Sequence, residues 1–348
     1  MKVALLTDTH FGARGDSVLF YDYMLEFYNN VFFPTIKERK IDTLIHLGDV
    51  VDRRKFINFN ILNRMKKDFI RELENHNLDT YFIVGNHDTY YKNTNKINAM
   101  ENILSGTDKN WNPKVIAEPE TVKIGDTDVF LLPWINSENY NDCMKAIKTT
   151  KSKVCFSHLE LAGFEMMRGL RNEGGMNADL FKKFDMVCTG HFHTKSIQNN
   201  ITYLGTAYEL FWSDYKDTKG FHIWDTETNE LEYIVNPHRM FYKIWYKEDE
   251  TVDLKSLKGK YVKLIVEDKP NPYKFDVFVD KLYKADIADI SIIEDDADID
   301  YEESDAADVT EDTMGLLSKY IDSYDIDVDK TKLKSIMNDL YVAALRGD

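Results

Sequence analysis

Aspartate, asparagine and histidine side chains that could bind metal ions follow five short apolar segments of this chain. These candidate ligands are Asp8, His10, Asp49, Asn86, His158, His191 and His193. Carboxylate, imidazole and amide donors in this mixture suit Mn²⁺, Fe²⁺ or Zn²⁺, in contrast to the all-oxygen sets that hold Ca²⁺. Each fragment alone is also compatible with ordinary turn chemistry or with a buried core histidine. Their recurrence at five segment ends predicts a metal centre.

The residues around Asp49 and Asn86 indicate what such a centre would do. A carboxylate can bridge two cations through its two oxygens, and Asp49 is the best candidate for that position. Two metal ions about 3.5–4 Å apart can activate a water and stabilise the leaving oxygen of a phosphodiester. His87 follows Asn86 directly, so it could face the substrate and protonate the leaving group. The pattern predicts a two-metal phosphoesterase with His87 as a catalytic residue.

The apolar segments themselves are typical of strands that are buried on both faces. They lie at residues 3–6, 44–47, 81–84, 154–156 and 186–188. In α/β folds, functional groups gather at the ends of such strands. Apolar residues recur at helical spacing over 17–40 and 58–76, and alternating runs around Gly125 predict a hairpin over 121–134. We therefore expect an α/β fold.

A smaller module and a tail are expected after residue 238. The module comprises a strand, a proline-containing break, a helix and a second strand, at residues 261–267, 270–272, 275–284 and 290–293. In 294–312, 11 of 19 residues are acidic, which predicts a flexible linker because too little apolar surface is available to order it. Two amphipathic helices are expected beyond it, with Leu333, Ile336 and Leu340 on one apolar face. The expected domains are 1–238, 239–293, 294–312 and 313–348.

The net charge of −16 is concentrated in the C-terminal part. Residues 294–348 carry −12, which leaves −4 on the first 293 residues. The acidity therefore does not exclude a nucleic-acid partner for that first part. Arg53, Arg54 and Lys55 could follow a DNA backbone, as could the basic residues of 64–71. The alternative is an ordinary solvated surface.

The cysteines favour a reducing compartment. Cys143, Cys155 and Cys188 form no CxxC pair, and two of them lie in strand-like segments, so we expect buried free thiols and a cytoplasmic location. No apolar run approaches 18 residues, so we expect no membrane span.

The order of the motifs resembles that of the calcineurin-like metallophosphoesterase superfamily. These motifs are Asp8-Thr9-His10, Gly48-Asp49, Gly85-Asn86-His87-Asp88, His158 and Gly190-His191-Phe192-His193. Within the superfamily, the chain is similar to the DNA double-strand-break repair nucleases of the SbcD type, including those of T-even-like phages. Further support comes from the stretches at 48–52, 131–134, 155–158 and 203–206. The match covers about 1–240 by motif.

The resemblance implies a two-sheet α/β sandwich flanked by helices, a small α+β capping domain that orients DNA, and a C-terminal helical segment. That segment would bind an SbcC-type coiled-coil ATPase. The implied activity is exonuclease and endonuclease cleavage at double-stranded DNA ends, in replication, recombination and repair. The implied cofactors are two divalent ions, Mn²⁺ or else Mg²⁺. A homodimer is also implied, through the helices between the second and third ligand strands. The apolar residues close to the site there, which could equally be ordinary core, are Phe56, Ile57, Phe59 and Ile61.

The resemblance also assigns the ligands to two ions. One ion would be held by Asp8, His10, Asp49 and His193. The other would be held by Asp49, Asn86, His158 and His191. In related phosphatases the second aspartate of the GDxxD motif orients the catalytic histidine, so Asp52 would hold His87. Some relatives carry a histidine there, and the role of Asp52 stays open.

Two other functions compete with a DNA nuclease. One is a phosphomonoesterase or cyclic-nucleotide phosphodiesterase of the same superfamily. The run Gly48 to Arg53 does echo the protein phosphatases, but Arg54 stands where they have glycine. The other is a non-catalytic scaffold that only anchors the ATPase. Its signature would be broken ligand positions, and none is broken.

Overall fold

The computed structural model describes residues 1–105, 111–167, 169–248 and 252–294, and in the C-terminal part residues 330, 332–334 and 336–337. Met1–Glu294 form one structural unit and Asp295–Asp348 form another. Apart from Glu294, the expected linker lies outside the described residues, as does Leu340 of the expected partner-binding helix. Within the described residues, no helix combines the length and apolar character needed to cross a bilayer.

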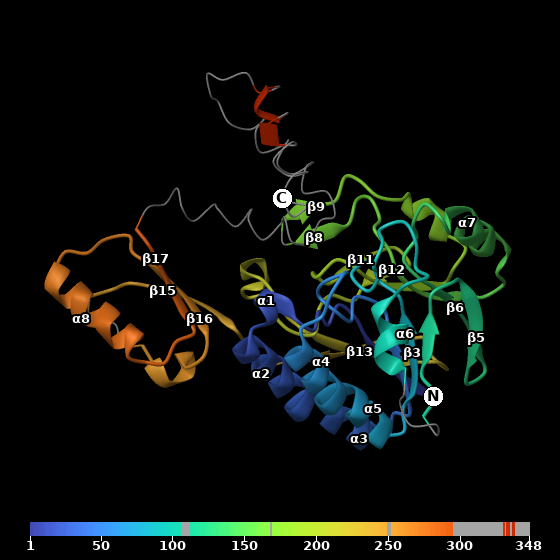
Figure 1. The fold of residues 1–348 in the computed structure, drawn as a ribbon, viewed down its shortest axis with the longest axis horizontal. Coiled ribbons are helices and arrows are strands. Elements are labelled where there is room, and N and C mark those ends of the chain that lie inside the picture. The colour runs from blue at the N-terminus through green and yellow to red at the C-terminus, as the bar shows by residue number, and fades with distance from the viewer. Residues whose placement is uncertain are drawn as a thin grey trace. The chain divides into compact units, whose positions relative to one another are not determined.

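Two six-stranded sheets form the framework of the first unit (Figure 1). The first has the order β14-β13-β1-β2-β3-β4, formed by β1 Lys2–Leu6, β2 Thr43–His46, β3 Asp79–Ile83, β4 Lys114–Ile116, β13 Gly220–Asp225 and β14 Leu231–Val235. The second has the order β11-β12-β10-β7-β6-β5, formed by β5 Glu120–Ile124, β6 Thr127–Leu132, β7 Val154–His158, β10 Met186–Gly190, β11 Ser196–Gln198 and β12 Ile201–Tyr203. A short pair consists of β8 Glu165–Met167 and β9 Leu170–Arg171. The five expected strands are confirmed as β1, β2, β3, β7 and β10.

Alternate residues of facing strands fill the space between the two sheets. Val3 and Leu5 of β1 share one buried cluster with Phe156 of β7, and Phe156 packs edge-on against Trp224 of β13 at 5.1 Å. The next residue along β7, Cys155, belongs instead to a cluster on the opposite face of the second sheet. The second sheet is therefore buried on both faces, which explains its uninterrupted apolar runs. All three cysteines are buried free thiols, as expected.

Helices cover the outer faces of the sandwich (Figure 1). Their bounds are α1 Ala13–Asp16, α2 Val18–Phe27, α3 Phe33–Arg39, α4 Phe59–Met65, α5 Arg71–Asn75, α6 Ala99–Leu104 and α7 Tyr140–Thr149. Wider π-type turns, Tyr28–Phe32 and Lys66–Ile70, join α2 to α3 and α4 to α5. The ring centres of Tyr28 and Phe69, one in each of these turns, lie 5.0 Å apart, and the ring of Phe32 packs against that of Phe221 in β13. The helices expected over 17–40 and 58–76 are thus present and pack on the first sheet.

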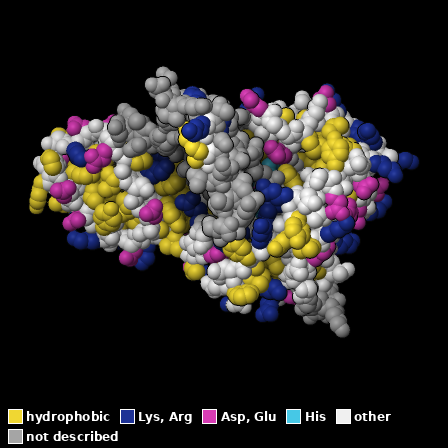
Figure 2. All heavy atoms as spheres, turned by 45° about the horizontal axis from the view of Figure 1, so that its top comes forward, with side chains coloured by type: hydrophobic (Ala, Val, Ile, Leu, Met, Phe, Trp, Pro, Cys, Tyr) yellow, Lys and Arg dark blue, Asp and Glu magenta, His cyan; other side chains and the backbone are white. Residues whose placement is uncertain are grey.

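The expected small module is a three-stranded parallel sheet with one helix. It contains β15 Phe241–Trp245, β16 Tyr261–Ile265, α8 Pro272–Tyr283 and β17 Asp289–Ile293, of which β15 was not expected. It has a hydrophobic cluster of its own, and Figure 2 shows further hydrophobic side chains on its surface. Buried Glu209 ties it to the sandwich, because its carboxylate accepts the N–H groups of Met240 and Phe241 at 2.7 and 3.0 Å. The domain division at residue 238 stays a prediction.

Candidate metal centre

The loops that follow β1, β2 and β10 are joined at one edge of the sandwich by hydrogen bonds from backbone N–H groups to carbonyl and carboxylate oxygens. The N–H of Asp8 donates to the carbonyl of Gly48 at 3.0 Å, and the N–H of His10 donates to that of Asp49 at 3.1 Å. The N–H of His191 donates to both carboxylate oxygens of Asp8 at 3.1 Å. Parallel pairing of β1 with β2 brings their carboxyl ends together, and the Asp8–His191 contact joins the second sheet to them.

Four of the candidate ligands have left-handed backbone conformations. The φ angles of Asp8, His10, Asp49 and His191 are 51°, 44°, 55° and 97°. Such a conformation costs a residue that carries a Cβ about 1–3 kcal/mol and persists only where the surroundings enforce it. Strain of this kind clusters at functional sites, and here it turns four side chains toward one volume.

Glycines at the motif positions permit a close approach of the ligand loops. A Cβ at Gly85 would lie 2.3 Å from Oδ1 of Asp49, and a Cβ at Gly190 would lie 2.1 Å from Oγ1 of Thr7. Real Cβ contacts do not reach such distances, so no side chain fits at either position. Close packing of the loops therefore requires glycine at these positions of Gly-Asn-His and Gly-His-x-His, whether or not a turn also requires it.

One group of potential ligands comes from the loops after β1 and β10. Asp8, His10 and His193 are buried, and each offers a ligand atom within 4.8 Å of the others. The Nε2 atoms of His10 and His193 face each other at 3.2 Å. Nε2 of His10 lies 3.9 Å from Oδ1 of Asp8. The ring nitrogens and the carboxylate thus surround one small volume.

The second group is formed by Asp49, His158 and His191, with Asn86 between them. Nδ1 of His158 donates to the carbonyl of Leu47 at 2.7 Å, so Nε2 is the atom that faces the group. This Nε2 lies 2.9 Å from Oδ1 of Asn86 and 3.2 Å from Oδ2 of Asp49. Nδ1 of His191 lies 3.0 Å from the same amide oxygen. Acceptor atoms converge here, and a proton or a metal cation has to lie between them.

Asp49 connects the two groups through a single oxygen. Its Oδ2 lies 3.2 Å from Nε2 of His158 and 3.9 Å from Nε2 of His10. Its Oδ1 accepts the backbone N–H of His87 at 2.7 Å. Oδ2 is therefore the oxygen that faces both groups, and the bridging role of Asp49 stays a prediction.

The carboxylates and imidazoles of the two ligand groups also shift one another's pKa values. Burial alone would lower the pKa of His158, but the carboxylates of Asp49 and Asp8 outweigh burial and raise it to about 9. Burial also opposes the protonation of His10, whereas Asp52 and Asp49 favour it. The pKa of His10 therefore rises to about 9 as well. Burial would raise the pKa of Asp49, yet His158 and His87 hold it well below its ordinary value. The buried imidazoles and carboxylates therefore favour the charged forms of one another.

His87 lies at the edge of the centre, half-buried, with its ring 4.9 Å from that of His10. Its Nδ1 donates to the backbone carbonyl of Asp52 at 2.6 Å, which leaves Nε2 for a substrate. The Asp52 carboxylate instead lies 3.6 Å from Nδ1 of His10. The catalytic role of His87 and the orienting role of Asp52 stay predictions, but the contact between them runs through the backbone of Asp52.

Sequence reasoning gave no role to three residues that hold the ligands in place. The buried Asp88 carboxylate accepts the N–H groups of Asp49, Val50, Val51 and Gly85, so it fixes the Asp49 loop. Nζ of Lys219 donates to the carbonyl of His193 at 2.8 Å, and Trp134 lies 5.2 Å from the ring of His191. Asp88 could have been suspected from its place directly after His87. No motif in the sequence points to the role of Lys219.

The expected DNA-binding residues lie beside this edge. Nη1 of Arg54 donates to Oγ1 of Thr89 at 2.8 Å, and its burial lowers its pKa. Arg53 pairs with Asp16 and stacks over Phe56, while Lys55 is exposed. The structure thus brings Arg54 to the loop after His87 and directs Arg53 toward α1.

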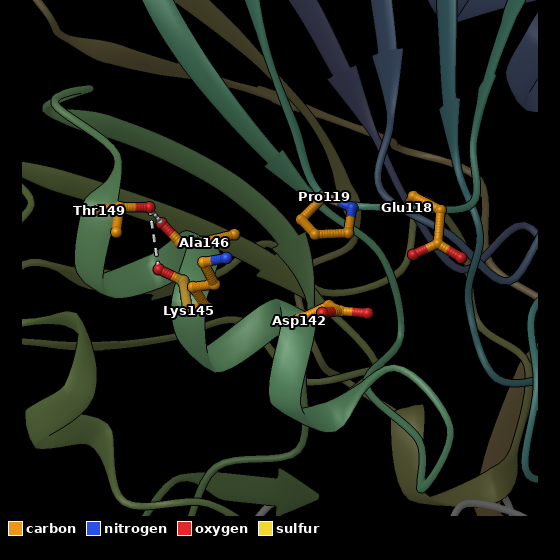
Figure 3. A pocket seen from close by; sticks show the side chains of 6 residues that line it. All are labelled: Glu118, Pro119, Asp142, Lys145, Ala146 and Thr149. Carbon is orange, nitrogen blue, oxygen red and sulfur yellow. Dashed lines mark hydrogen bonds between the residues drawn. The ribbon is translucent and has the colours of Figure 1, made fainter.

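A surface hollow of about 380 Å³ lies elsewhere, over α7 (Figure 3). It is lined by Glu118, Pro119, Asp142, Lys145, Ala146 and Thr149. None of these residues belongs to the two ligand groups. This hollow is therefore separate from the candidate metal centre.

Comparison with known proteins agrees with this geometry. Residues 1–195 match the calcineurin-like phosphoesterase family, and this region contains every residue of the two ligand groups. The chain belongs to the calcineurin-like phosphoesterase family. Membership, together with the two buried ligand groups, supports a metal-dependent phosphodiesterase with a centre for two divalent ions.

One relative within this family is similar over its whole length. Exonuclease subunit 1 of Enterobacteria phage T4 is 31% identical over 347 residues, which cover 99% of each chain. Two solved structures also match. An archaeal phosphodiesterase covers 68% of this chain and 100% of its own, with 15% identity and a TM-score of 0.35. A dimetal phosphatase from Danio rerio covers 64% of this chain and 91% of its own, with 13% identity and a TM-score of 0.39.

Proposed function

We propose that the chain is a two-metal DNA nuclease that hydrolyses phosphodiesters at DNA ends, by exonuclease and endonuclease cleavage, in replication, recombination and repair. The observation that carries this proposal is the pair of buried ligand groups joined by Oδ2 of Asp49, with His87 beside them. The full-length similarity to a phage exonuclease subunit supports DNA as the substrate.

The donor set fits two divalent cations, with Mn²⁺ as our first choice. Asp8, His10, His193 and Asp49 would hold one, and Asp49, Asn86, His158 and His191 the other. Such a pair would polarise the phosphodiester and supply an activated water. Nδ1 of His87 is engaged at the same edge, so Nε2 is the ring nitrogen that would meet a substrate. A bound phosphate adds negative charge beside His87 and favours its protonated form, which can then donate a proton to the leaving oxygen.

The proposed partner is an SbcC-type coiled-coil ATPase, bound by Leu333, Ile336 and Leu340. The name of the phage relative, a subunit, supports a partner, and Ile336 is 48% exposed. Truncation after Asp312 should abolish co-purification with the ATPase and preserve cleavage of small substrates. A truncated chain that binds its partner with full affinity would place the interface elsewhere.

We also propose a homodimer through the segment that contains Phe56 and Phe59. These side chains are 62% and 86% exposed, which is unusual for phenylalanine. Ile61, by contrast, is buried and belongs to the core. Light scattering should give twice the chain mass at micromolar concentration, and Phe59→Lys should give the monomer mass. A monomeric wild-type protein would contradict the proposal.

Cleavage of three substrates tests the proposed function directly. Purified protein with Mn²⁺ is assayed on DNA, on bis-p-nitrophenyl phosphate, which is a diester without bases, and on p-nitrophenyl phosphate, which is a monoester. A nuclease hydrolyses DNA with the highest kcat/KM and scarcely attacks the monoester. A preference for the monoester would favour the phosphatase alternative. No hydrolysis of any of the three, with metal bound, would favour the scaffold alternative.

A further inference from the structure

The loop over residues 89–98 follows the catalytic motif, and its two ends are hydrogen-bonded to each other. Thr89 and Asn98 pair as an isolated antiparallel bridge, and the N–H of Tyr90 donates to the carbonyl of Ile97 at 2.9 Å. The N–H of Ala99 donates to the carbonyl of Asp88 at 2.7 Å. The two ends of the loop over residues 89–98 are therefore held together directly beside His87.

Buried amides fix the same loop from inside. Asn95 and Asn98 are 3% and 2% exposed. Nδ2 of Asn95 donates to the carbonyl of Trp134 at 2.9 Å, and Oδ1 of Asn95 accepts from Nδ2 of Asn136 at 2.9 Å. Asn98 caps α6 by accepting the N–H of Glu101. Satisfied buried amides of this kind give a loop one conformation, so its outward residues are held at defined positions.

The outward face of this rigid loop is aromatic. Tyr90 and Tyr91 are 39% and 51% exposed, and Ile97 opposite Tyr90 is 50% exposed. The two rings are 4.6 Å apart in an edge-to-face arrangement, at an interplanar angle of 77°. Aromatic side chains usually bury most of their surface. A pair that is fixed and yet exposed has ring surface available for a flat ligand.

The surroundings of the pair favour a nucleic acid as that ligand. Thr89 donates to the carbonyl of Asn86, a candidate ligand, at 3.1 Å and accepts from Arg54 at 2.8 Å. Exposed Lys92 follows the pair in the chain. Cationic groups beside exposed rings are what proteins present to single-stranded DNA, in which phosphates and base faces alternate. The loop is also continuous with the motif that would cleave the backbone.

We propose that Tyr90 and Tyr91 form a stacking subsite for an unpaired nucleobase of the DNA strand that enters the metal centre. This inference rests on the proposed nuclease function and deepens it. Stacking tolerates any base, because each base has a π face, so the subsite would favour frayed or single-stranded ends without selecting a sequence. The phenolic hydroxyls are not required, and phenylalanine should replace either tyrosine.

The test compares three double variants with the wild-type protein. Tyr90→Ala with Tyr91→Ala removes the rings, and Tyr90→Phe with Tyr91→Phe keeps them. Tyr140→Ala with Ile197→Ala is the control, since these side chains are 49% and 65% exposed on α7 and β11. The readout is the ratio of kcat/KM for a single-stranded oligonucleotide to that for bis-p-nitrophenyl phosphate, with Mn²⁺. Fluorescence anisotropy measures binding of the same oligonucleotide, with a single abasic position scanned along it.

We expect the ratio to fall about 10-fold for the alanine pair, the effect of losing a base–aromatic stack, and to change little for the phenylalanine pair and the control. One abasic position should weaken binding to the wild-type protein and have no effect on the alanine pair. An unchanged ratio, an equal loss on both substrates, or an abasic scan identical in both proteins would overturn the subsite. So would a change of oligomeric mass in the alanine pair, which would indicate a protein interface. If the wild-type protein cleaves no DNA, the proposed function fails, and the binding scan still decides the subsite.

Discussion

Nδ1 of His87 lies 2.6 Å from the backbone carbonyl oxygen of Asp52, a hydrogen bond that needs no side chain at residue 52. The Asp52 carboxylate is directed to His10 instead, at 3.6 Å from Nδ1. The two contacts of Asp52 are thus made by different atoms. Substitution of its side chain separates support of His10, a candidate metal ligand, from orientation of His87.

For Asp52→Ala we therefore expect weakened Mn²⁺ binding with His87 still oriented. Loss of a carboxylate that supports a ligating histidine costs about 10–100-fold in metal affinity. At saturating Mn²⁺, kcat should stay far above that of His87→Ala. Calorimetric titration and kcat at saturating metal measure the two effects. A kcat as low as that of His87→Ala, with both metals bound, would mean that the carboxylate acts on His87 after all.

His87→Ala should lower kcat by about 10²–10⁴-fold, the usual contribution of a general acid. Metal content should stay at two ions per chain, because Nδ1 of His87 donates to a carbonyl and its ring belongs to neither ligand group. Turnover and metal stoichiometry are measured on the same preparation, with His238→Ala as a control for removing a half-buried histidine elsewhere. Loss of metal together with activity would assign His87 to the ligands.

Asp49→Ala should remove both metal ions cooperatively, since Oδ2 of Asp49 faces both ligand groups. Asp8→Ala is the matched comparison, because Asp8 belongs to one group only. Asp8→Ala should weaken the binding of one metal ion more than the binding of the other. Calorimetry with Mn²⁺ resolves the two sites. One site of wild-type affinity in Asp49→Ala would contradict a bridge.

Gly85→Ala should reduce metal binding severely although alanine is a small residue. Its Cβ would meet Oδ1 of Asp49 at 2.3 Å and the backbone nitrogen of Asp49 at 2.4 Å, so the Asp49 loop must shift. Gly174→Ala is the control, because its Cβ would meet only Oδ1 of Asn172, at an ordinary 3.6 Å. Metal titration and thermal unfolding of both variants provide the comparison. Equal behaviour of the two variants would show that the loop has more room than the structure indicates.

Metal affinity should increase with pH up to about 9. The metal-free centre holds protons on His10 and His158, whose pKa values are raised to about 9, and a ligating nitrogen must lose its proton. Below pH 9, each proton that must be released weakens metal binding about 10-fold per pH unit. With two such protons, the metal affinity should fall by up to about 100-fold from pH 8 to pH 7. Calorimetry in buffers of different ionisation enthalpy counts the protons released. Metal binding at pH 7 that releases none would contradict protonated imidazoles in the metal-free centre.

The parts of the fold that follow local rules could be predicted from the sequence. Continuous apolar runs at 3–6 and 154–156 predicted strands buried on both faces, because only such strands need no polar side. The helices over 17–40 and 58–76 followed from their spacing. The strand Phe241–Trp245 was missed, since it pairs with β16, a strand of the same module that comes later in the chain.

The candidate ligands were identifiable for a related reason. Metal chemistry demands particular donor atoms, and parallel strands bring their carboxyl ends to one edge, so residue type and position after a strand suffice to name Asp8, Asp49 or His158. Local patterns in the sequence were therefore enough to predict the α/β class and to name the candidate residues of the centre.

The contacts that hold this centre were decided only by the tertiary structure. Which oxygen of Asp49 faces both ligand groups depends on the N–H of His87, 38 residues away, which occupies Oδ1. The support of His193 by Lys219 joins a strand end to a loop 26 residues later, and Asp88 reaches back to the loop after β2. Hydrogen bonds act over about 3 Å in space and do not depend on distance along the chain. A sequence therefore shows which atoms can bond, whereas only the folded backbone decides which of them meet.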